Sequence, residues 1–328
     1  MFKNLKVKTV LLAGLAGILF TGCGQQETVK VVKLAHALDR SHSVHKAMEF
    51  MADKLEEKSE GRMRIDIYPS QQLGTERECL ELLQIGSLDM TKVSAAVMES
   101  YSDNYKIFGI PYLFRDTQHQ YKVLDSEIGR NLLSEGEKYW MHGLCFYASG
   151  SRSFYTKTRP IRKPEDVKGL KVRVMQSATS INMVRTMGGS PTPISFGELY
   201  TALQQGVVDG AENNPPSFYL SRHYEVCKFY TLDEHTSIPD IMLVSTTFWE
   251  SLSEQEKEWL QQAADESVPY QRKLWEESEL EALNGVKEAG VEIIYPDKSE
   301  FVEATEAMYE DYRDVGDVYR LIQEIKDM

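Results

Sequence analysis

Apolar and polar residues follow two different periods along the chain, and these periods mark predicted strands and helices. Strands are predicted at residues 29–37, 63–68, 170–175 and 241–245. Helices are predicted at residues 43–59 and, as a long polar helix, at residues 254–289. Strands that alternate with helices indicate an α/β protein with mostly parallel sheets, in which ligand sites lie at the carboxyl ends of the strands.

The long helix has a clear start signal and an internal proline. Ser253 and Glu256 have the spacing of a capping box, which satisfies two free backbone donors at a helix start. Pro269 lies within the predicted helix and lacks a backbone N–H. We therefore expect a kink or a break at this residue.

Two segments that lie 120 residues apart, beginning at 75 and 195, repeat one pattern. Each has a Ser or Thr suited to cap a helix, a Glu three residues later, then leucine, a helix-ending glycine and an aspartate before a strand. The matching pairs are Thr75/Ser195, Glu78/Glu198, Leu83/Leu203, Gly86/Gly206 and Asp89/Asp209. Helix-to-strand units of α/β proteins often end in Gly and Asp without duplication. We interpret the five coincident pairs as two similar α/β lobes that face each other across a cleft.

The first 22 residues have the pattern of an export signal. A basic start with Lys3, Lys6 and Lys8 precedes an apolar run, residues 10–20, that is too short to span a bilayer. The run ends in Phe-Thr-Gly-Cys, and this resembles a bacterial lipoprotein signal in which Cys23 becomes the lipidated N-terminus. Residues 23–28 then form a tether. The alternative is an ordinary secretory signal with an incidental cysteine.

The net charge of the chain limits the kinds of binding partner that we expect. The sequence has 37 Lys and Arg against 50 Asp and Glu, a net charge of -13. Removal of residues 1–22, which contain three lysines and no acid, leaves 34 against 50, a net charge of -16. Nucleic acid is therefore not an expected partner, because phosphate binding needs a basic surface. An anionic ligand requires a local cationic pocket.

Signatures of catalysis, metal binding and redox chemistry are weak. The sequence after residue 22 has no GxSxG, HExxH, GxxxxGK[ST] or GxGxxG motif, so we predict no enzyme and no cofactor. His36, His42 and His45 lie close together, but no cysteine or carboxylate joins them at metal-ligand spacing, so we predict no metal site. Beyond Cys23 there are three cysteines and no CxxC pair, which leaves one disulfide open: Cys79, Cys145 and Cys227.

Two arginines are candidate ligands for an anion. Arg152 lies in a strand-like segment expected to cross between the lobes, and Arg173 lies between valines in a predicted buried strand. A charge in such a strand is unfavourable unless it is paired. A structural salt bridge is one interpretation of Arg173. The other is a carboxylate clamp, because the planar guanidinium donates two parallel hydrogen bonds that lysine cannot reproduce.

The repeat places further candidates at equivalent depths of the two lobes. Glu212 and Asn213 follow Asp209 near the end of one strand, and Lys92 occupies the corresponding place after Asp89. Glu76 and Phe196 take matching first positions of the repeated helices. They can supply a hydroxyl acceptor and an apolar wall. The structural alternatives are a solvated Lys92, a first-turn acid favoured by the helix dipole and a core aromatic residue.

Several sequence stretches resemble motifs of one protein family and occur in the same order as in that family. They are residues 68–74 (YPSQQLG), 86–89 (GSLD), 169–174 (GLKVRV), 190–193 (SPTP) and 202–213 (ALQQGVVDGAEN). These motifs resemble the DctP-like solute-binding proteins of tripartite ATP-independent periplasmic (TRAP) transporters and extend over nearly all of the chain after the signal. The resemblance implies a small organic anion as ligand and membrane permease subunits as partners.

The resemblance also implies a fold and a set of site residues. The fold is an α/β clamshell with a long C-terminal helix that spans both lobes. Lobe I comprises residues 29–150 and 239–278, and lobe II residues 151–238 and 279–328. The family's carboxylate-anchoring arginine matches Arg173. Its other ligand positions match Arg152, Asn213 and the stacking Phe196. The polar positions at the other end of the pocket fall on Glu76, Gln176 and, with a looser alignment, His235, and the first-strand contacts fall loosely on the region of His36.

The ligand class follows from finer similarity. Residues 200–214 with 232–235 (LDEH) are similar to members that bind hexuronates such as glucuronate or galacturonate. Lys92, Glu76, Asn213 and His235 would then meet sugar hydroxyls. Sialate binders carry an acid where Ser94 stands, which makes sialate the weaker match. Dicarboxylates, 2-oxo acids bound with a cation beside a glutamate, and a role as ligand-sensing receptor for a membrane kinase stay open.

Overall fold

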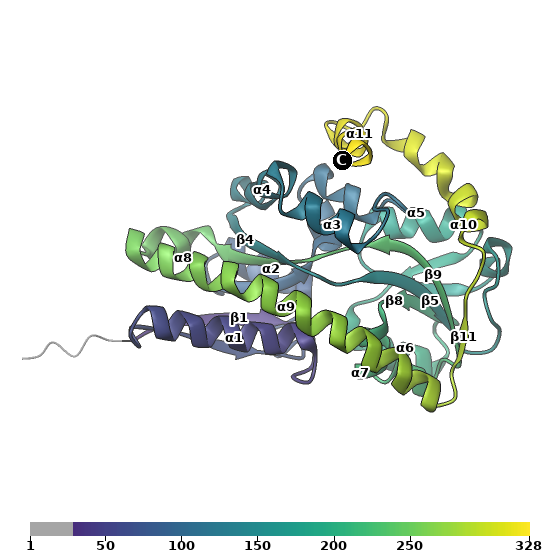
Figure 1. The fold of residues 1–328 in the computed structure, drawn as a ribbon, viewed down its shortest axis with the longest axis horizontal. Helices are drawn as coiled ribbons and strands as arrows, with labels where there is room; N and C mark the ends of the chain where they lie inside the picture. Colours follow the sequence, from purple (N-terminus) through teal and green to yellow (C-terminus); the bar gives the residue numbers. More distant parts are fainter. Residues whose placement is uncertain (1–28) are drawn as a thin grey trace, which may run out of the picture.

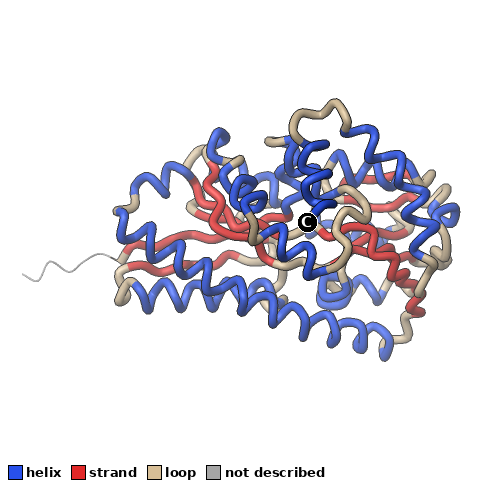
Figure 2. Tube along the Cα trace, turned by 45° about the horizontal axis from the view of Figure 1, so that its top comes forward, coloured by secondary structure: helices blue, strands red, loops and turns tan. Residues whose placement is uncertain are grey.

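The protein is described by a computed structural model that covers residues 29–328 (Figure 1). The predicted signal at residues 1–22, the lipidation site Cys23 and the tether to residue 28 lie outside these residues. All four predicted strands and both predicted helices are present. They form two lobes, each built on one sheet (Figure 2).

The sheet of lobe I has five strands in the order β2-β1-β3-β10-β4. The bounds are β2 Met63–Tyr68, β1 Lys30–His36, β3 Met90–Ser94, β10 Asp240–Ser245 and β4 Met141–Tyr147. Only β10 runs against the others, since it is antiparallel to both β3 and β4. The helices of the lobe are α1 Ser43–Lys58, α2 Glu76–Gln84, α3 Thr117–Leu124, α4 Glu127–Ser134 and α8 Thr246–Ser251, with three 3₁₀ segments, η1 Ala95–Ser100, η2 Asp103–Gly109 and η3 Glu137–Tyr139.

The sheet of lobe II has six strands in the order β11-β9-β5-β8-β6-β7. The bounds are β11 Glu292–Ile294, β9 Phe229–Ser237, β5 Ser151–Thr156, β8 Gly210–Asn213, β6 Lys171–Val174 and β7 Ser190–Pro193. Here β5 alone is reversed. The prediction of mostly parallel sheets is therefore confirmed. The helices of the lobe are α5 Ala178–Thr186, α6 Leu199–Gln205, α7 Pro215–Leu220 and α10 Lys298–Thr305.

The two lobes share one topology, as the repeat predicted. The order β2-β1-β3-β10-β4 corresponds strand by strand to β7-β6-β8-β5-β9, with the reversed strand in the same place. The repeated aspartates have equivalent roles. Asp89 accepts a hydrogen bond from the backbone N–H of Lys33, and Asp209 accepts one from that of Lys171, both at 2.8 Å. Each aspartate thus fixes the register of its strand on the neighbouring strand.

The repeated helices differ at their starts. Thr75 and Glu78 form the predicted capping box. In lobe II the hydroxyl of Ser195 also donates to the carboxylate three residues later, that of Glu198, at 2.6 Å, but it accepts no backbone hydrogen bond and no capping box forms. The chain first makes a short 3₁₀ turn, η5 Phe196–Glu198, before α6 begins. The prediction of a second capping box was wrong because the N–H of Glu198 bonds to the backbone oxygen of Ser195 at 3.3 Å within this turn, and not to the Ser195 hydroxyl.

The long helix α9, Glu254–Glu288, runs along both lobes and packs on α1 of lobe I and α7 of lobe II (Figure 1). It begins with the predicted capping box at Ser253 and Glu256. It continues through Pro269, so the helix does not break there. A single helix of 35 residues is about 50 Å long, enough to connect two small lobes.

The chain crosses between the lobes at β4–β5 and β9–β10, and α9 holds the first crossing. The side-chain amide of Gln271 bonds to both the N–H and the C=O of Ala148 at 2.8 Å. Gly150 has a φ of 56°, and a Cβ there would lie 2.3 Å from Glu279 Oε1 and 2.8 Å from Trp275 Nε1. Glycine is thus required for both its backbone conformation and the close approach of α9.

The end of the chain departs from the predicted division of lobes. Strand β11 and helix α10 lie on lobe II, as the assignment of residues 279–328 expected. The last helix, α11 Val318–Asp327, instead packs on η2 of lobe I. Its apolar residues recur at helical spacing and bury one face among Tyr105 and Phe108 of that lobe. They are Val318, Leu321, Ile322 and Ile325.

Two further observations concern residues 29–328 as a whole. No helix in this range is both long and apolar enough to cross a bilayer. The three cysteines that it contains, Cys79, Cys145 and Cys227, are buried and form no disulfide.

Candidate functional site

A polar cleft lies between the lobes, at the ends of the central strands. The free volume among its side chains is about 40 Å³. Its walls come from β3, β10 and the first crossing on one side and from β5, β6, β8 and α7 on the other. The lining residues are Ala37, Leu38, His42, Glu76, Lys92, Ser94, Ser149, Arg152, Arg173, Met175, Phe196, Asn213, Asn214, Ser217 and Asp240.

Arg173 is a buried cation that no acid of residues 29–328 neutralises by an ion pair. Its side chain on β6 is only 3% exposed. Its Nε donates to the backbone oxygen of Ile194 at 2.8 Å, which holds the guanidinium in place. Its Nη1 is buried without a hydrogen-bond partner. Burial lowers the pKa of the guanidinium, as expected for a charge removed from water without a counterion.

Arg152 differs from Arg173 because its charge is compensated inside lobe II. Its Nε and Nη2 bond to the two carboxylate oxygens of Glu212 at 2.5 and 3.0 Å. Its Nη1 donates to the side-chain oxygen of Asn213 at 2.9 Å. Burial raises the pKa of Glu212, but the Arg152 charge outweighs it and the pKa falls to about 2. Nη2 also donates to the backbone oxygen of Glu212, so four of the five N–H groups are engaged. Arg152 therefore offers the cleft one remaining N–H, on Nη1, without adding an uncompensated charge.

Asn213 and Phe196 complete the lobe II wall. The side-chain oxygen of Asn213 accepts from Arg152 and from the Asn214 N–H, both at 2.9 Å. The amide Nδ2 is thus the group that Asn213 can offer to a ligand. Phe196 is partly buried and meets the ring of His223 edge-on at 5.8 Å between centroids. It forms the apolar side of the cleft.

The lobe I wall contains a lysine between two carboxylates. Lys92 Nζ lies 3.2 Å from Asp240 Oδ1 and 3.6 Å from Glu76 Oε1. Glu76 Oε1 also accepts from the backbone N–H of Ser94 at 3.1 Å. Burial raises the pKa of Asp240 to about 6, with Lys92 opposing the shift and Glu76 adding to it. Lys92 is 2% exposed, so it is not a solvated surface lysine.

His235 lies outside the cleft. Its Nδ1 is 2.7 Å from Asp233 Oδ2, and its Nε2 is 3.6 Å from Glu212 Oε2, the oxygen that also accepts from Arg152 Nε. Burial lowers the pKa of this imidazole, but the two carboxylates raise it to about 9. The predicted role of His235 as a hydroxyl contact is therefore not supported by its position, because its charged partners are internal acids.

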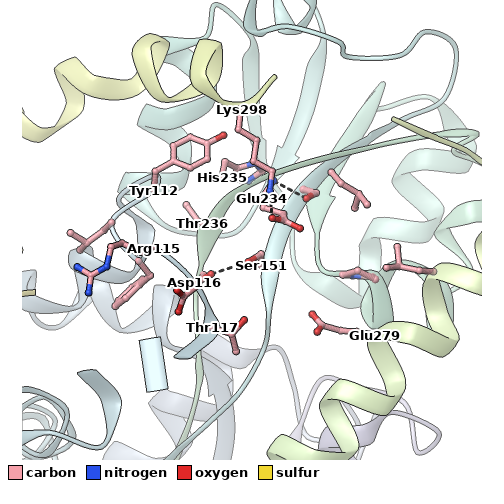
Figure 3. A pocket seen from close by; sticks show the side chains of 17 residues that line it. Tyr112, Arg115, Asp116, Thr117, Ser151, Glu234, His235, Thr236, Glu279 and Lys298 are labelled. Carbon is pink, nitrogen blue, oxygen red and sulfur yellow. Dashed lines mark hydrogen bonds and ion pairs between the residues drawn. The ribbon is translucent and has the colours of Figure 1, made fainter. Parts of the chain in front are cut away.

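His235 borders a second cavity of about 330 Å³, which is lined by β5, β9, residues 112–117 and α9 (Figure 3). In Figure 3, Glu234 and Lys298 lie beside His235, and Glu279 lies on the opposite side. Glu234 and Lys298 form an ion pair with each other. Arg152, Glu212, His235 and Asp233 thus form a row of alternating charge that extends from the cleft toward this cavity.

Two other predicted contacts are absent from the lining of the main cleft. His36 is buried at the end of β1, where its Nε2 is 2.9 Å from His45 Nδ1 and its Nδ1 accepts from the Leu38 N–H. Burial and the Lys92 charge lower the pKa of His36 to about 2, so it is neutral. Gln176 borders a narrow extension of the cleft beside Arg173. Within residues 29–328 no three His, Cys, Asp or Glu side chains gather in a way that could hold a metal.

Several cleft residues escaped prediction. Asp240 stands at the start of a strand, where a charge signals little, and only its pairing with Lys92 brings it into the site. His42 was considered only with its histidine neighbours, yet its ring reaches across to Ser217 of lobe II at 3.4 Å. Asn214 is recognisable from sequence as the cap of α7 before two prolines. Its contact with Ser149 of the crossing, at 3.3 Å, is not.

Comparison with known proteins identifies the family to which this sequence is similar. Residues 34–314 match the family described as bacterial extracellular solute-binding protein, family 7 (DctP). The chain is 37% identical over 322 residues to the protein YiiZ of Salmonella typhimurium, covering 98% of this chain and 97% of that protein.

Solved structures agree in fold as well as in sequence. A TRAP periplasmic solute-binding protein from Bradyrhizobium, in complex with galacturonate, is 36% identical. It superposes with a TM-score of 0.89 and covers 91% of this chain and 100% of its own. A TRAP protein from Chromohalobacter salexigens with bound D-glucuronate is 33% identical, with a TM-score of 0.87 over 90% of this chain and 99% of its own. The chain therefore belongs to the DctP family of extracytoplasmic TRAP solute-binding proteins, whose members bind small solutes for transport and are not enzymes.

Proposed function

We propose that this protein captures a hexuronate, such as glucuronate or galacturonate, and delivers it to the permease subunits of a TRAP transporter. The observation that carries the proposal is Arg173, a fixed and buried guanidinium that forms no ion pair with any acid of residues 29–328. A carboxylate that accepts two parallel hydrogen bonds from this fork would neutralise it. The galacturonate and glucuronate bound to the Bradyrhizobium and Chromohalobacter proteins are ligands of this class.

The size of the cleft supports capture by movement of the lobes. Its free volume of about 40 Å³ is well below the ~300–1,000 Å³ typical of ligand pockets. Entry of a sugar acid therefore requires the lobes to separate at the two crossing strands. A ligand that binds Arg173 of lobe II and Lys92, Glu76 or Asp240 of lobe I bridges both walls. Only this difference in affinity between the open and closed states can drive closure.

A binding screen tests the proposal. D-glucuronate and D-galacturonate are expected to raise the melting temperature and to give saturable heats in titration calorimetry. At a ligand concentration 100 times the Kd, the stabilisation amounts to about 2.7 kcal/mol. D-glucose and D-galactose, which lack the carboxylate, serve as matched controls and should not bind. A larger response to a four-carbon dicarboxylate, a 2-oxo acid or sialate would replace the uronate by that ligand, and recovery of a changed product would contradict a binding role.

We further propose that Cys23 carries a lipid that anchors the mature protein to a membrane. The support is the basic start, the short apolar run and the Thr-Gly-Cys sequence that ends it. Cells that express the full chain with radiolabelled palmitate should incorporate label into it, and Cys23→Ser should release the protein from the membrane fraction. Unlabelled wild-type protein, or a Cys23→Ser variant that stays membrane-bound, would contradict the anchor.

A further inference from the structure

Building on the proposed uronate function, we propose that Asp240, with Glu76 and Lys92, makes the lobe I wall a hydroxyl-accepting subsite that excludes a second carboxylate. The ligand would then be a monoanion that turns its carboxylate toward lobe II and its hydroxyls toward lobe I. Asp240 is the specificity-determining residue of this wall.

The charges of the two walls carry the inference. On lobe II, Arg173, Arg152 and Glu212 sum to a formal charge of +1, because one acid faces two arginines. On lobe I, Lys92, Glu76 and Asp240 sum to -1, because one lysine faces two acids. A carboxylate is attracted to the first wall and repelled by the second. A dicarboxylate long enough to touch both walls places its second charge on the wrong one.

The free atoms of lobe I suit hydroxyl donors. Lys92 is engaged by Glu76 Oε1 and Asp240 Oδ1, and Glu76 Oε1 also accepts from Ser94. Glu76 Oε2 and Asp240 Oδ2 have no hydrogen-bond or ion-pair partner within residues 29–328, and both side chains line the cleft. An ionised carboxylate only accepts hydrogen bonds, so these two oxygens bind ligand O–H groups and cannot bind a ligand carboxylate.

Of the two acids, Asp240 should repel a ligand carboxylate more strongly because it is more deeply buried. Its side chain is 7% exposed, against 18% for that of Glu76. Water therefore screens a charge placed against Asp240 less than one placed against Glu76. Asp240 also occupies the first position of the reversed strand β10, directly after the second crossing, where lobe movement changes its distance from lobe II.

The test compares D-glucuronate with D-glucarate, which carries a carboxylate at both ends, by titration calorimetry at pH 8. D-glucarate is expected to bind at least ~100-fold more weakly. In Asp240→Asn, which keeps the shape and one acceptor, the glucarate affinity should rise by at least ~10-fold relative to that for glucuronate. D-gluconate, an open-chain monocarboxylate, controls for the open chain and should show no such gain. Asp53→Asn, the same change at an exposed position of α1, should leave the ratio unchanged.

A second variant and a second pH provide the same test if Asp240→Asn folds poorly. Glu76→Gln should relax the ratio in the same direction. Wild-type protein should also discriminate less at pH 5, because Asp240, with a pKa of about 6, becomes protonated there. The charged groups that face it are Lys92 on β3, Glu76 on α2 and Arg152 on β5.

The outcomes separate this inference from the proposed function. Equal binding of glucuronate and glucarate by wild type, or a ratio that neither variant nor pH changes, would overturn the role of Asp240 and leave uronate binding intact. Failure of glucuronate, galacturonate and every other monocarboxylate to bind would overturn the proposed function itself.

Discussion

Replacement of Arg173 by alanine is expected to abolish measurable binding of a sugar acid, and replacement by lysine to weaken it by at least ~100-fold. The guanidinium is fixed through Nε to the Ile194 backbone, which leaves its remaining N–H groups to form a planar fork toward the cleft. Lysine keeps the charge but has no fork, so it cannot make the two parallel hydrogen bonds. Titration calorimetry with D-glucuronate at pH 7 measures the effect.

A matched control separates the site from a general effect of arginine loss. Arg185 lies on α5 of the same lobe and is exposed, and Arg185→Lys is expected to bind with native affinity. Native affinity in Arg173→Lys would rule out the clamp.

Stability gives a second, independent signature of Arg173. A buried charge without a partner destabilises the fold, so Arg173→Met, which keeps the chain length, should raise the melting temperature in the absence of ligand. The same variant should not bind glucuronate. An arginine with a structural role would behave in the opposite way, and a lower melting temperature for Arg173→Met would identify it as such.

Local features of the fold were predictable from sequence because their determinants lie within a few residues. The capping boxes at Thr75 and Ser253 and the helix-ending Gly86 each depend on contacts three to five positions apart. The strands were recognisable from the alternation of apolar and polar neighbours. The repeat at an offset of 120 residues extended these local signals to the shared topology of the lobes. It also brought Lys92 to the depth of Asn213, and both line the cleft.

Contacts between distant segments could not be derived in this way. Whether an arginine in a strand is paired depends on which strand lies next to it and on its register. Arg152 meets Glu212 because β5 and β8 are antiparallel neighbours, 60 residues apart in sequence. Arg173, on a strand of the same sheet, forms no ion pair with an acid in the part of the chain that the structure describes. From the residues alone, Arg152 and Arg173 are equally good candidates for anion binding. Only the packing shows that Glu212 compensates the charge of Arg152.

The sequence did not show which histidines reach the cleft, and the reason is related. A residue that is near a site in sequence can point away from it, because successive side chains of a strand face opposite sides. His36 at the end of β1 turns into the core toward His45, whereas His42 six residues later reaches the cleft. The position of α11 could not be predicted either. Its apolar face indicates that it is buried, but the pattern does not tell which lobe provides the partner.

Glu212→Gln is expected to destabilise the protein by about 3–5 kcal/mol, since it removes the one acid between two buried cations. Arg152 and His235 both contact the carboxylate oxygen Oε2 of Glu212. The neutral amide leaves Arg152 uncompensated and removes one of the two charges that keep His235 protonated. Urea denaturation at pH 7 measures the loss. Glu292→Gln, at an exposed glutamate of lobe II that pairs with Arg162, is the matched control and should change stability by less than ~1 kcal/mol.

The dependence of stability on pH tests the same row of charges. The pKa of His235 is raised from 6.5 to about 9, so its contribution is fully present below pH 6.5 and is lost as the pH rises through 9. The pKa of Glu212 is lowered to about 2, so its contribution is present above its ordinary pKa of 4.5 and is lost as the pH falls through 2. Wild-type protein should therefore lose stability between pH 7 and 9.5, and in Glu212→Gln this alkaline loss should shrink because the pKa of His235 falls. A variant with native stability and an unchanged alkaline loss would show that Glu212 does not couple Arg152 to His235.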